Sequence, residues 1–135
     1  MTQPYFVSPE ELYHKSVILA RTILDSGFRP DYIVGIWRGG TPPGIATHGF
    51  LRAHGIKADH FPIMTRRYVE GCQDTESDNV LVHQLEYLIE RVNSEDKLLL
   101  IDDVFDKGIT LDRVVKKIHE LARKNTPHDI RIGTV

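Results

Sequence analysis

Apolar residues follow two different periods along the chain, and their alternation predicts an α/β protein. From Ser8 to Gly27, apolar positions recur at helical spacing between a capping serine and a glycine that ends the helix. The run YIVGIW (32–37) is short and rich in β-branched residues, so it predicts a buried strand. A second helix is expected over 43–54. Its apolar side is expected to consist of Ile45, Ala46, Gly49, Phe50 and Ala53.

The second half of the chain repeats this order of elements. We expect strands at 57–64, 97–101 and 129–135 and helices at 83–91 and 110–124. Pro62 favours a position at a sheet edge for the first of these strands, because proline cannot donate a ladder hydrogen bond. The segment 65–79 is polar and has neither period, which is typical of a mobile active-site loop.

Strands that alternate with helices predict a doubly wound, mostly parallel sheet. The expected spatial order of the four strands, numbered along the chain, is 2-1-3-4. The chain (1–135) is long enough for a single domain and too short for two. Its last strand ends with the sequence, so we expect that C-terminal elements of the natural fold are missing.

Charge and composition exclude several classes of protein. The formal net charge is −2 and no polybasic run is present, so neither nucleic acid nor a membrane is an expected partner. No apolar run approaches the roughly 18 residues that span a bilayer, and the first residues lack the pattern of a signal peptide. Cys72 is the single cysteine, which excludes an internal disulfide. We expect a cytoplasmic protein.

The segment LLLIDDVFDKGITLDR carries the most informative chemistry. It leads a buried strand into an acid pair, Asp102 and Asp103, and then into a glycine turn at the start of a helix. A helix N-terminus attracts anions, and Lys107, Gly108 and Thr110 add a charge, close backbone approach and a hydroxyl. This half of the segment predicts a phosphate site. The acid pair would repel phosphate, so it predicts contacts with hydroxyls or a metal ion.

A ligand with a monophosphate at one end and a vicinal diol at the other fits both halves, and ribose 5-phosphate has that shape. Arg38, Gly39 and Gly40 follow an earlier strand and offer a cation and an open backbone to a second phosphate group. If the two strands are neighbours, both loops line one crevice at the carboxyl ends of the sheet. An acid pair alone, or two glycines alone, also fits an ordinary solvent-facing turn.

The remaining reactive side chains give weaker signals. None of the seven histidines has metal-ligand spacing, and Cys72 has no partnering histidine in its polar loop. Arg66, Arg67 and Tyr68 fit either a solvated loop base or an active-site lid.

Two of these motifs resemble motifs of the type I phosphoribosyltransferases. LLLIDDVFDKGITL resembles the family's binding signature for phosphoribosyl pyrophosphate (PRPP), and IVGIWRGGTPPGIA resembles its pyrophosphate loop. The spacing of the motifs and the loop 65–79 are most similar to the hypoxanthine and hypoxanthine-guanine branch. The resemblance extends over the chain from Tyr5. It implies transfer of the 5-phosphoribosyl group of PRPP to hypoxanthine, guanine or xanthine, with release of pyrophosphate, in purine salvage.

The resemblance also implies a role for each site residue. Asp102 and Asp103 would bind the ribose hydroxyls, with Asp103 also near a Mg²⁺ ion. Asp106 would be catalytic and would handle the proton at purine N7. The 5-phosphate would be bound by Asp106, Lys107, Gly108, Ile109 and Thr110. Pyrophosphate would be bound by Arg38, Gly39 and Gly40, and the lid loop would contribute Arg67 and Tyr68.

The chain departs from the family pattern at two positions, with Lys107 in place of a threonine and Arg67 in place of a small residue. Both changes are expected to alter the affinity for PRPP without excluding catalysis. The family's purine-reading lysine and aromatic residue would follow Val135. Family resemblance and the geometry of the turn predict a cis peptide between Trp37 and Arg38. We also expect a homodimer or homotetramer.

Two other classes stay open. A PRPP-sensing regulator of the same fold would bind nucleic acid, which a net charge of −2 without a basic stripe disfavours. A phosphoacceptor receiver domain also has acids at strand ends, but it would need a late lysine and would have no Arg-Gly-Gly loop.

Overall fold

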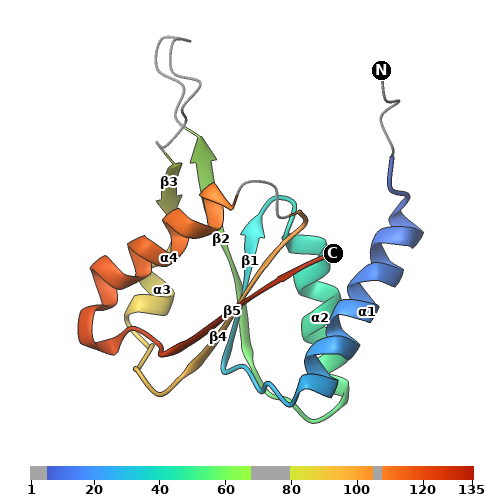
Figure 1. Cartoon of the computed structure of the whole chain (residues 1–135), viewed down its shortest axis with the longest axis horizontal. Coiled ribbons are helices and arrows are strands. Elements are labelled where there is room, and N and C mark those ends of the chain that lie inside the picture. Colours follow the sequence, from blue (N-terminus) through green and yellow to red (C-terminus); the bar gives the residue numbers. More distant parts are fainter. Residues whose placement is uncertain (1–5, 68–79, 105–107) are drawn as a thin grey trace.

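One five-stranded sheet forms the centre of the molecule. The computed structural model describes residues 6–67, 80–104 and 108–135. The strands are β1 (Tyr32–Trp37), β2 (Asp59–Arg67), β3 (Val80–His83), β4 (Lys97–Asp102) and β5 (Asp129–Thr134), in the spatial order β3-β2-β1-β4-β5 (Figure 1). Only the pair β2–β3 is antiparallel. The predicted mostly parallel sheet and the predicted order of its four long strands are therefore confirmed.

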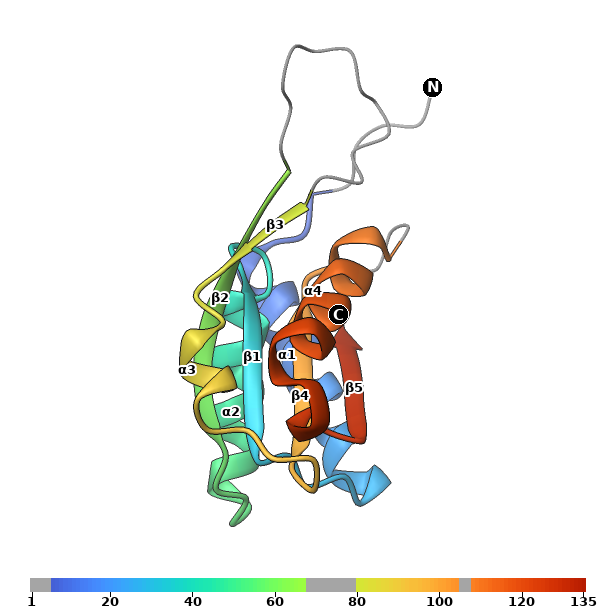
Figure 2. The same cartoon turned by 90° about the vertical axis from the view of Figure 1, so that its left-hand side faces the viewer.

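Helices cover both faces of this sheet. They are α1 (Pro9–Ser26) and α2 (Thr41–Ala53) on one face, and α3 (Glu86–Ile89) and α4 (Ile109–Ala122) on the other (Figures 1 and 2). Side chains alternate along a strand, so neighbouring residues of β1 enter different cores. Ile33 packs in the cluster with Leu51 of α2, whereas Val34 packs in the cluster with Val114 of α4. The sheet is doubly wound, as predicted.

The first helix begins and ends where the sequence predicts. The Ser8 hydroxyl accepts a hydrogen bond from the Glu11 amide at 3.1 Å, which satisfies one of the free donors of the first turn. Gly27 ends the helix with φ of 83°, a left-handed conformation that glycine adopts without steric penalty.

The strand β3 was not predicted, and it changes the position of β2 in the sheet. Residues 65–67, expected in the loop, extend β2 and pair with β3 instead. Pro62 nevertheless lies on a stretch that has no neighbour on that side, because the β2–β3 register begins only at Met64. The expected position of this strand at a sheet edge is therefore wrong for β2 as a whole and holds only for its first half, where β1 is the one neighbouring strand. Helix α3 is also shorter than the helix expected over 83–91.

The expected apolar side of α2 is wrong. The buried residues of this helix are Pro43, Gly44, Thr47 and Leu51. Ile45 is 60% exposed, whereas Leu51 is fully buried and the expected Phe50 packs against the same core cluster. Small residues bring α2 close to β1 and β2. Gly44, for example, lies against the His60 ring of β2, where a Cβ atom would come within 3.1 Å of Nε2.

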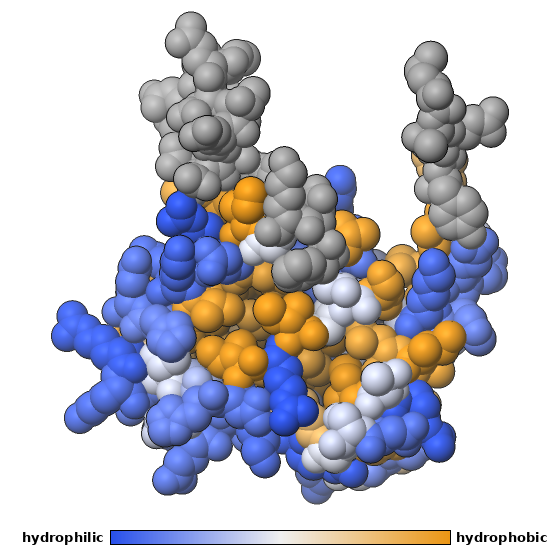
Figure 3. All heavy atoms as spheres, viewed as in Figure 1, coloured by the Kyte–Doolittle hydropathy of each residue, from blue (hydrophilic) through white to orange (hydrophobic). Residues whose placement is uncertain are grey.

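The surface is mixed in character. In Figure 3, hydrophilic side chains surround an apolar area at the centre of the visible face, where β5 forms the edge of the sheet. Within the residues that the structure describes, no helix is both long enough and apolar enough to cross a membrane.

Candidate active site

The loop after β1 is a tight turn anchored to the strand that it follows. The Gly40 amide donates to the Ile36 carbonyl at 2.8 Å, and the Thr41 amide donates to the Arg38 carbonyl at 3.1 Å. The peptide between Trp37 and Arg38 is cis, which confirms the prediction from the sequence. Helix α2 begins directly after the turn. The exposed Arg38 and the partly exposed Gly39 are thereby presented at the carboxyl end of β1, while Gly40 is buried.

The acid pair occupies the corresponding position on β4. Asp102 is the last residue of the strand, Asp103 follows it, and both are half-buried. The Asp103 amide donates to Asp102 Oδ1 at 2.9 Å, and the Val104 amide donates to Asp103 Oδ1 at 2.8 Å. One oxygen of each carboxylate is thus fixed by a backbone amide.

Gly39 brings the two loops into direct contact. A Cβ atom on Gly39 would lie only 2.7 Å from Asp103 Oδ1. A Cβ atom on Gly40 would lie 2.8 Å from the Ile36 amide nitrogen and would also meet the Ile101 carbonyl of β4. Backbone atoms leave room only for glycine at Gly40, whereas at Gly39 the close atoms belong to the Asp103 side chain. The expectation that the loops after β1 and β4 meet at one edge of the sheet is confirmed, while the binding roles of their residues stay predictions.

At this end of the sheet, the helices that follow the strands also switch from one face of the sheet to the other. Strands β1 and β4 are parallel neighbours, with Gly35 beside Ile101. The helix after β1 covers one face of the sheet, and the helix after β4 covers the other (Figure 1). In doubly wound sheets, ligands bind at such a switch point.

Burial raises the pKa of the Asp102 carboxyl from 3.8 to about 6, and the neighbouring Asp103 carboxyl adds to the increase. The hydrogen bond from the Asp103 amide acts in the opposite direction. The surroundings of the acid pair therefore disfavour a second negative charge. They favour hydroxyl donors or a cation beside the pair.

The predicted 5-phosphate segment is described from Gly108 onward. Gly108 caps α4 with φ of 71°, and its carbonyl accepts the Asp112 amide at 2.9 Å, which closes the first turn. Ile109 and Thr110 form the start of that turn and are half-buried. Asp106 and Lys107 lie outside the described residues. The N-terminus of α4, with its positive dipole end, follows the acid pair by a few residues.

The predicted lid can be traced only at its beginning. Arg67 is the last residue of β2, and Tyr68 lies outside the described residues, like the rest of 68–79. Strand β2 continues three residues beyond Met64, the partner of Trp37 at the end of β1. Strand β2 therefore ends beyond the end of β1.

The acid pair fits a Mg²⁺ site in which the substrate supplies some of the metal ligands. Among the described residues, no group of three or more histidine, cysteine, aspartate or glutamate side chains converges as a metal site. Mg²⁺ is commonly held by one or two carboxylates together with waters and substrate phosphates. Asp103, with one oxygen fixed by Val104, provides such a carboxylate.

Thr41 was not singled out from the sequence. Its hydroxyl is buried and has no hydrogen-bond partner among the described residues, and its amide is bound to Arg38. A buried hydroxyl without a partner is unfavourable. A threonine at the start of a helix carries no other signal, so sequence reasoning could not distinguish this donor beside the loop.

The sheet order, the switch point and the two loops define the fold of the type I phosphoribosyltransferases. No protein-family model matches the chain, and no curated protein sequence matches it. Solved structures do match it over nearly its whole length.

Three of these structures illustrate the likeness. Purine phosphoribosyltransferase from Pyrococcus horikoshii is 20% identical, with a TM-score of 0.70 over 95% of this chain and 73% of its own. Hypoxanthine-guanine phosphoribosyl transferase from L. donovani is 16% identical, with a TM-score of 0.73 over 100% and 72%. A hypothetical protein from Neisseria gonorrhoeae with bound ppGpp is 18% identical, with a TM-score of 0.71 over 99% and 82%. These matches establish the fold.

Proposed function

We propose that the protein is a purine phosphoribosyltransferase that transfers the 5-phosphoribosyl group of PRPP to hypoxanthine, guanine or xanthine. The observation that carries this proposal is the contact between Gly39 and Asp103. It joins a loop suited to pyrophosphate and an acid pair suited to ribose hydroxyls at the switch point of a phosphoribosyltransferase fold.

Three groups of residues each bind a different part of PRPP. Asp102 and Asp103 accept hydrogen bonds from the 2- and 3-hydroxyls of the ribose through the oxygens that the backbone leaves free. The segment 106–110 binds the 5-phosphate at the N-terminus of α4, where free N–H groups attract anions. The loop from Arg38 to Gly40 binds the pyrophosphate, with one guanidinium charge and with the partly exposed backbone at Gly39.

In the reaction, the bond between ribose C1 and the pyrophosphate oxygen breaks, and a bond from C1 to a purine nitrogen forms. The electron pair of the broken bond leaves with pyrophosphate, and Asp106 accepts the purine proton at N7. Positive charge develops on the ribose in between, so the nearby carboxylates stabilise it. The protein otherwise contributes by holding the two reactants in line.

Asp103 would hold Mg²⁺, which would supply positive charge to the pyrophosphate when it is bound. Lys107 adds a further cation to the segment that binds the 5-phosphate, and Arg67 and Tyr68 belong to the proposed lid. We further propose that the protein acts in the cytoplasm as a homodimer or homotetramer.

The direct test is incubation of the purified protein with PRPP, Mg²⁺ and hypoxanthine, guanine or xanthine in turn, with pyrophosphate and nucleotide as readouts. Pyrophosphate release that requires one of the purines supports the proposal. PRPP binding without turnover of any purine would support a PRPP-sensing regulator of the same fold instead. Neither binding nor turnover would refute both.

A further inference from the structure

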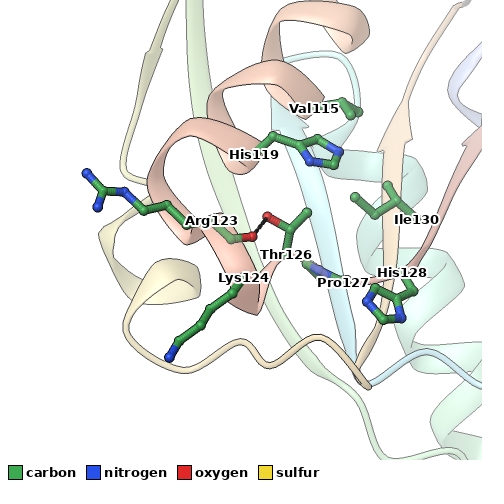
Figure 4. Close-up of a pocket in the computed structure, with 8 residues that line it drawn as sticks. All are labelled: Val115, His119, Arg123, Lys124, Thr126, Pro127, His128 and Ile130. Carbon is green, nitrogen blue, oxygen red and sulfur yellow. Dashed lines mark hydrogen bonds between the residues drawn. The ribbon is translucent and has the colours of Figure 1, made fainter.

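A cavity of about 440 Å³ lies between the C-terminal end of α4 and the beginning of β5 (Figure 4). Its lining residues are Val115, His119, Arg123, Lys124, Thr126, Pro127, His128 and Ile130. None of them belongs to the loops of the candidate active site. Helix α4 begins at Ile109, and the first lining residue, Val115, lies six residues further along it, which is about 9 Å by the helical rise.

The cavity has an unusual charge for this protein. Its ionisable lining residues are all basic or imidazole groups, and no carboxylate lines it. The closest acids in sequence are already paired: Glu120 with Lys117 at 3.5 Å, and Asp129 with Arg131 at 3.1 Å. Arg123 and Lys124 form no ion pair with another described residue. In a chain with a net charge of −2, this concentration of positive charge favours an anion.

Basic residues also complement the negative end of a helix dipole, and that explains part of the cluster. Two of the local carbonyls, however, those of His119 and Arg123, already accept hydrogen bonds from the backbone or from Thr126. The Arg123 carbonyl accepts from the Thr126 hydroxyl at 2.6 Å, drawn in Figure 4, and from the Thr126 amide at 3.1 Å. His128 lies across the cavity at the start of β5, beyond the end of the helix. The charges are therefore available to a ligand.

The two sides of the cavity differ in chemistry. In Figure 4, the His119 ring lies between Val115 and Ile130, which give that side a largely apolar surface. Arg123 and Lys124 extend from the other side toward solvent. Their side chains are exposed and flexible, so they can turn toward an anion at the mouth without disturbing the packing.

We propose that this cavity is a second ligand site that binds a nucleotide. The base packs on the apolar side with the imidazole of His119, and the phosphate is bound by Arg123 and Lys124. A flat, weakly polar ring joined to a phosphate matches both sides, whereas a simple anion uses only one. The volume lies within the range of small-molecule sites, about 300–1,000 Å³.

The test is titration of the ¹⁵N-labelled protein with AMP, inorganic phosphate and adenosine, followed by amide chemical shifts. AMP is expected to give saturable shifts for amides between 115 and 130, at lower concentration than phosphate or adenosine. The variant Arg123→Glu/Lys124→Glu should weaken this binding roughly tenfold or more, because charge-assisted hydrogen bonds are lost. Arg123→Gln/Lys124→Gln gives the same test with a smaller change in charge.

The matched control is Lys116→Glu/Lys117→Glu. It changes the net charge equally on the helix that precedes Arg123 and Lys124, but these lysines pair with Asp112 and Glu120 and do not line the cavity. It should leave AMP binding within about twofold of the wild type. An equal loss in both variants, or no localised shift with AMP, would overturn the site. Phosphate that binds as tightly as AMP would overturn the assignment of a nucleotide. Active-site amides report any separate binding there.

Discussion

At the scale of single residues, Asp102 shows that the site contains a negative charge that is unfavourable without a ligand. Its pKa is raised to about 6 by burial, so at neutral pH the folded protein holds a carboxylate in a place that disfavours the charge. The full increase would correspond to about 3 kcal/mol. Because the side chain is half-exposed, solvent screening reduces the effect on the free energy of unfolding to roughly 1 kcal/mol.

Asp102→Asn should therefore stabilise the protein without ligand at pH 7.5, by about 1 kcal/mol. The folded pKa lies above the unfolded one, so the penalty on the charged form is complete above pH 6 and disappears as the pH falls toward 3.8. The gain of the variant should shrink over the same interval. Urea unfolding at several pH values measures it, with the exposed Asp25→Asn as the control. A gain that does not change between pH 4 and 7.5 would contradict this account of Asp102.

Gly39 and Gly40 should respond differently to alanine. At Gly40 the new methyl group would meet backbone of β1 and β4, which cannot move aside, so stability should fall by about 1–3 kcal/mol. At Gly39 it would meet the Asp103 side chain, which can rotate. Gly39→Ala should therefore keep its stability and lose PRPP binding. Thermal unfolding and calorimetric titration separate the two effects.

The control for this pair is Gly49→Ala. A Cβ atom at this helical glycine would meet nothing within 4 Å, so the variant should be more stable by about 0.5–1 kcal/mol. Equal losses of stability at Gly39 and Gly40 would argue against the packing of the first loop on the acid pair.

Asp106→Asn should lower turnover by a factor on the order of 10²–10⁴, because positioned proton transfer typically contributes this much. Binding of PRPP should be nearly unchanged. Steady-state rates with the preferred purine, combined with PRPP titration, measure both quantities. Turnover at the wild-type rate would remove Asp106 from the role of proton acceptor.

At the scale of elements, apolar periodicity predicted what depends on local sequence. The strand order followed because buried strands such as 97–101 and connecting helices allow few topologies. Strand β3 was missed because its four residues form a strand only by pairing with the end of β2. The buried side of α2 was missed because Gly44 and Thr47 face the sheet, and small residues contribute little to an apolar pattern.

At the site, too, the sequence predicted local features and missed those that depend on tertiary contacts. The acid pair and the glycines were visible as motifs, since their chemistry is unusual at strand ends. The predicted strand order brought the two loops together, but the direct approach of Gly39 to the Asp103 side chain was not predicted, because it depends on the conformation of the two turns. The unpartnered hydroxyl of Thr41 depends on packing alone.

Helix α1 offers a prediction at this scale. Ser8→Ala removes the acceptor of the Glu11 amide and should lower the free energy of unfolding by about 1 kcal/mol. Ser8→Asp should retain the cap and also complement the helix dipole. Thermal unfolding of both variants measures the two expected changes in stability. Equal stability of the alanine and aspartate variants would show that the cap does not contribute.

At the scale of the whole molecule, the two ends of α4 lie in opposite electrostatic environments. The beginning follows an acid pair that requires a cation or hydroxyl donors, and the end carries positive charge without an acidic partner. Both places are at the surface of the same domain, so ligands for either should stabilise the fold as a whole. Their contributions are separable by mutation because the sites share no residue.

PRPP with Mg²⁺ should accordingly raise the melting temperature of the protein. A ligand that binds only the folded state stabilises it by about 2.7 kcal/mol at 100 times its dissociation constant. Replacing both acids, in Asp102→Asn/Asp103→Asn, should abolish this increase, because the ribose hydroxyls and the metal then lose their carboxylates. Arg123→Glu/Lys124→Glu should retain it in full, since those side chains line the other cavity. A shift that survived in the first variant and vanished in the second would place PRPP at the end of α4 and refute the ribose site at β4.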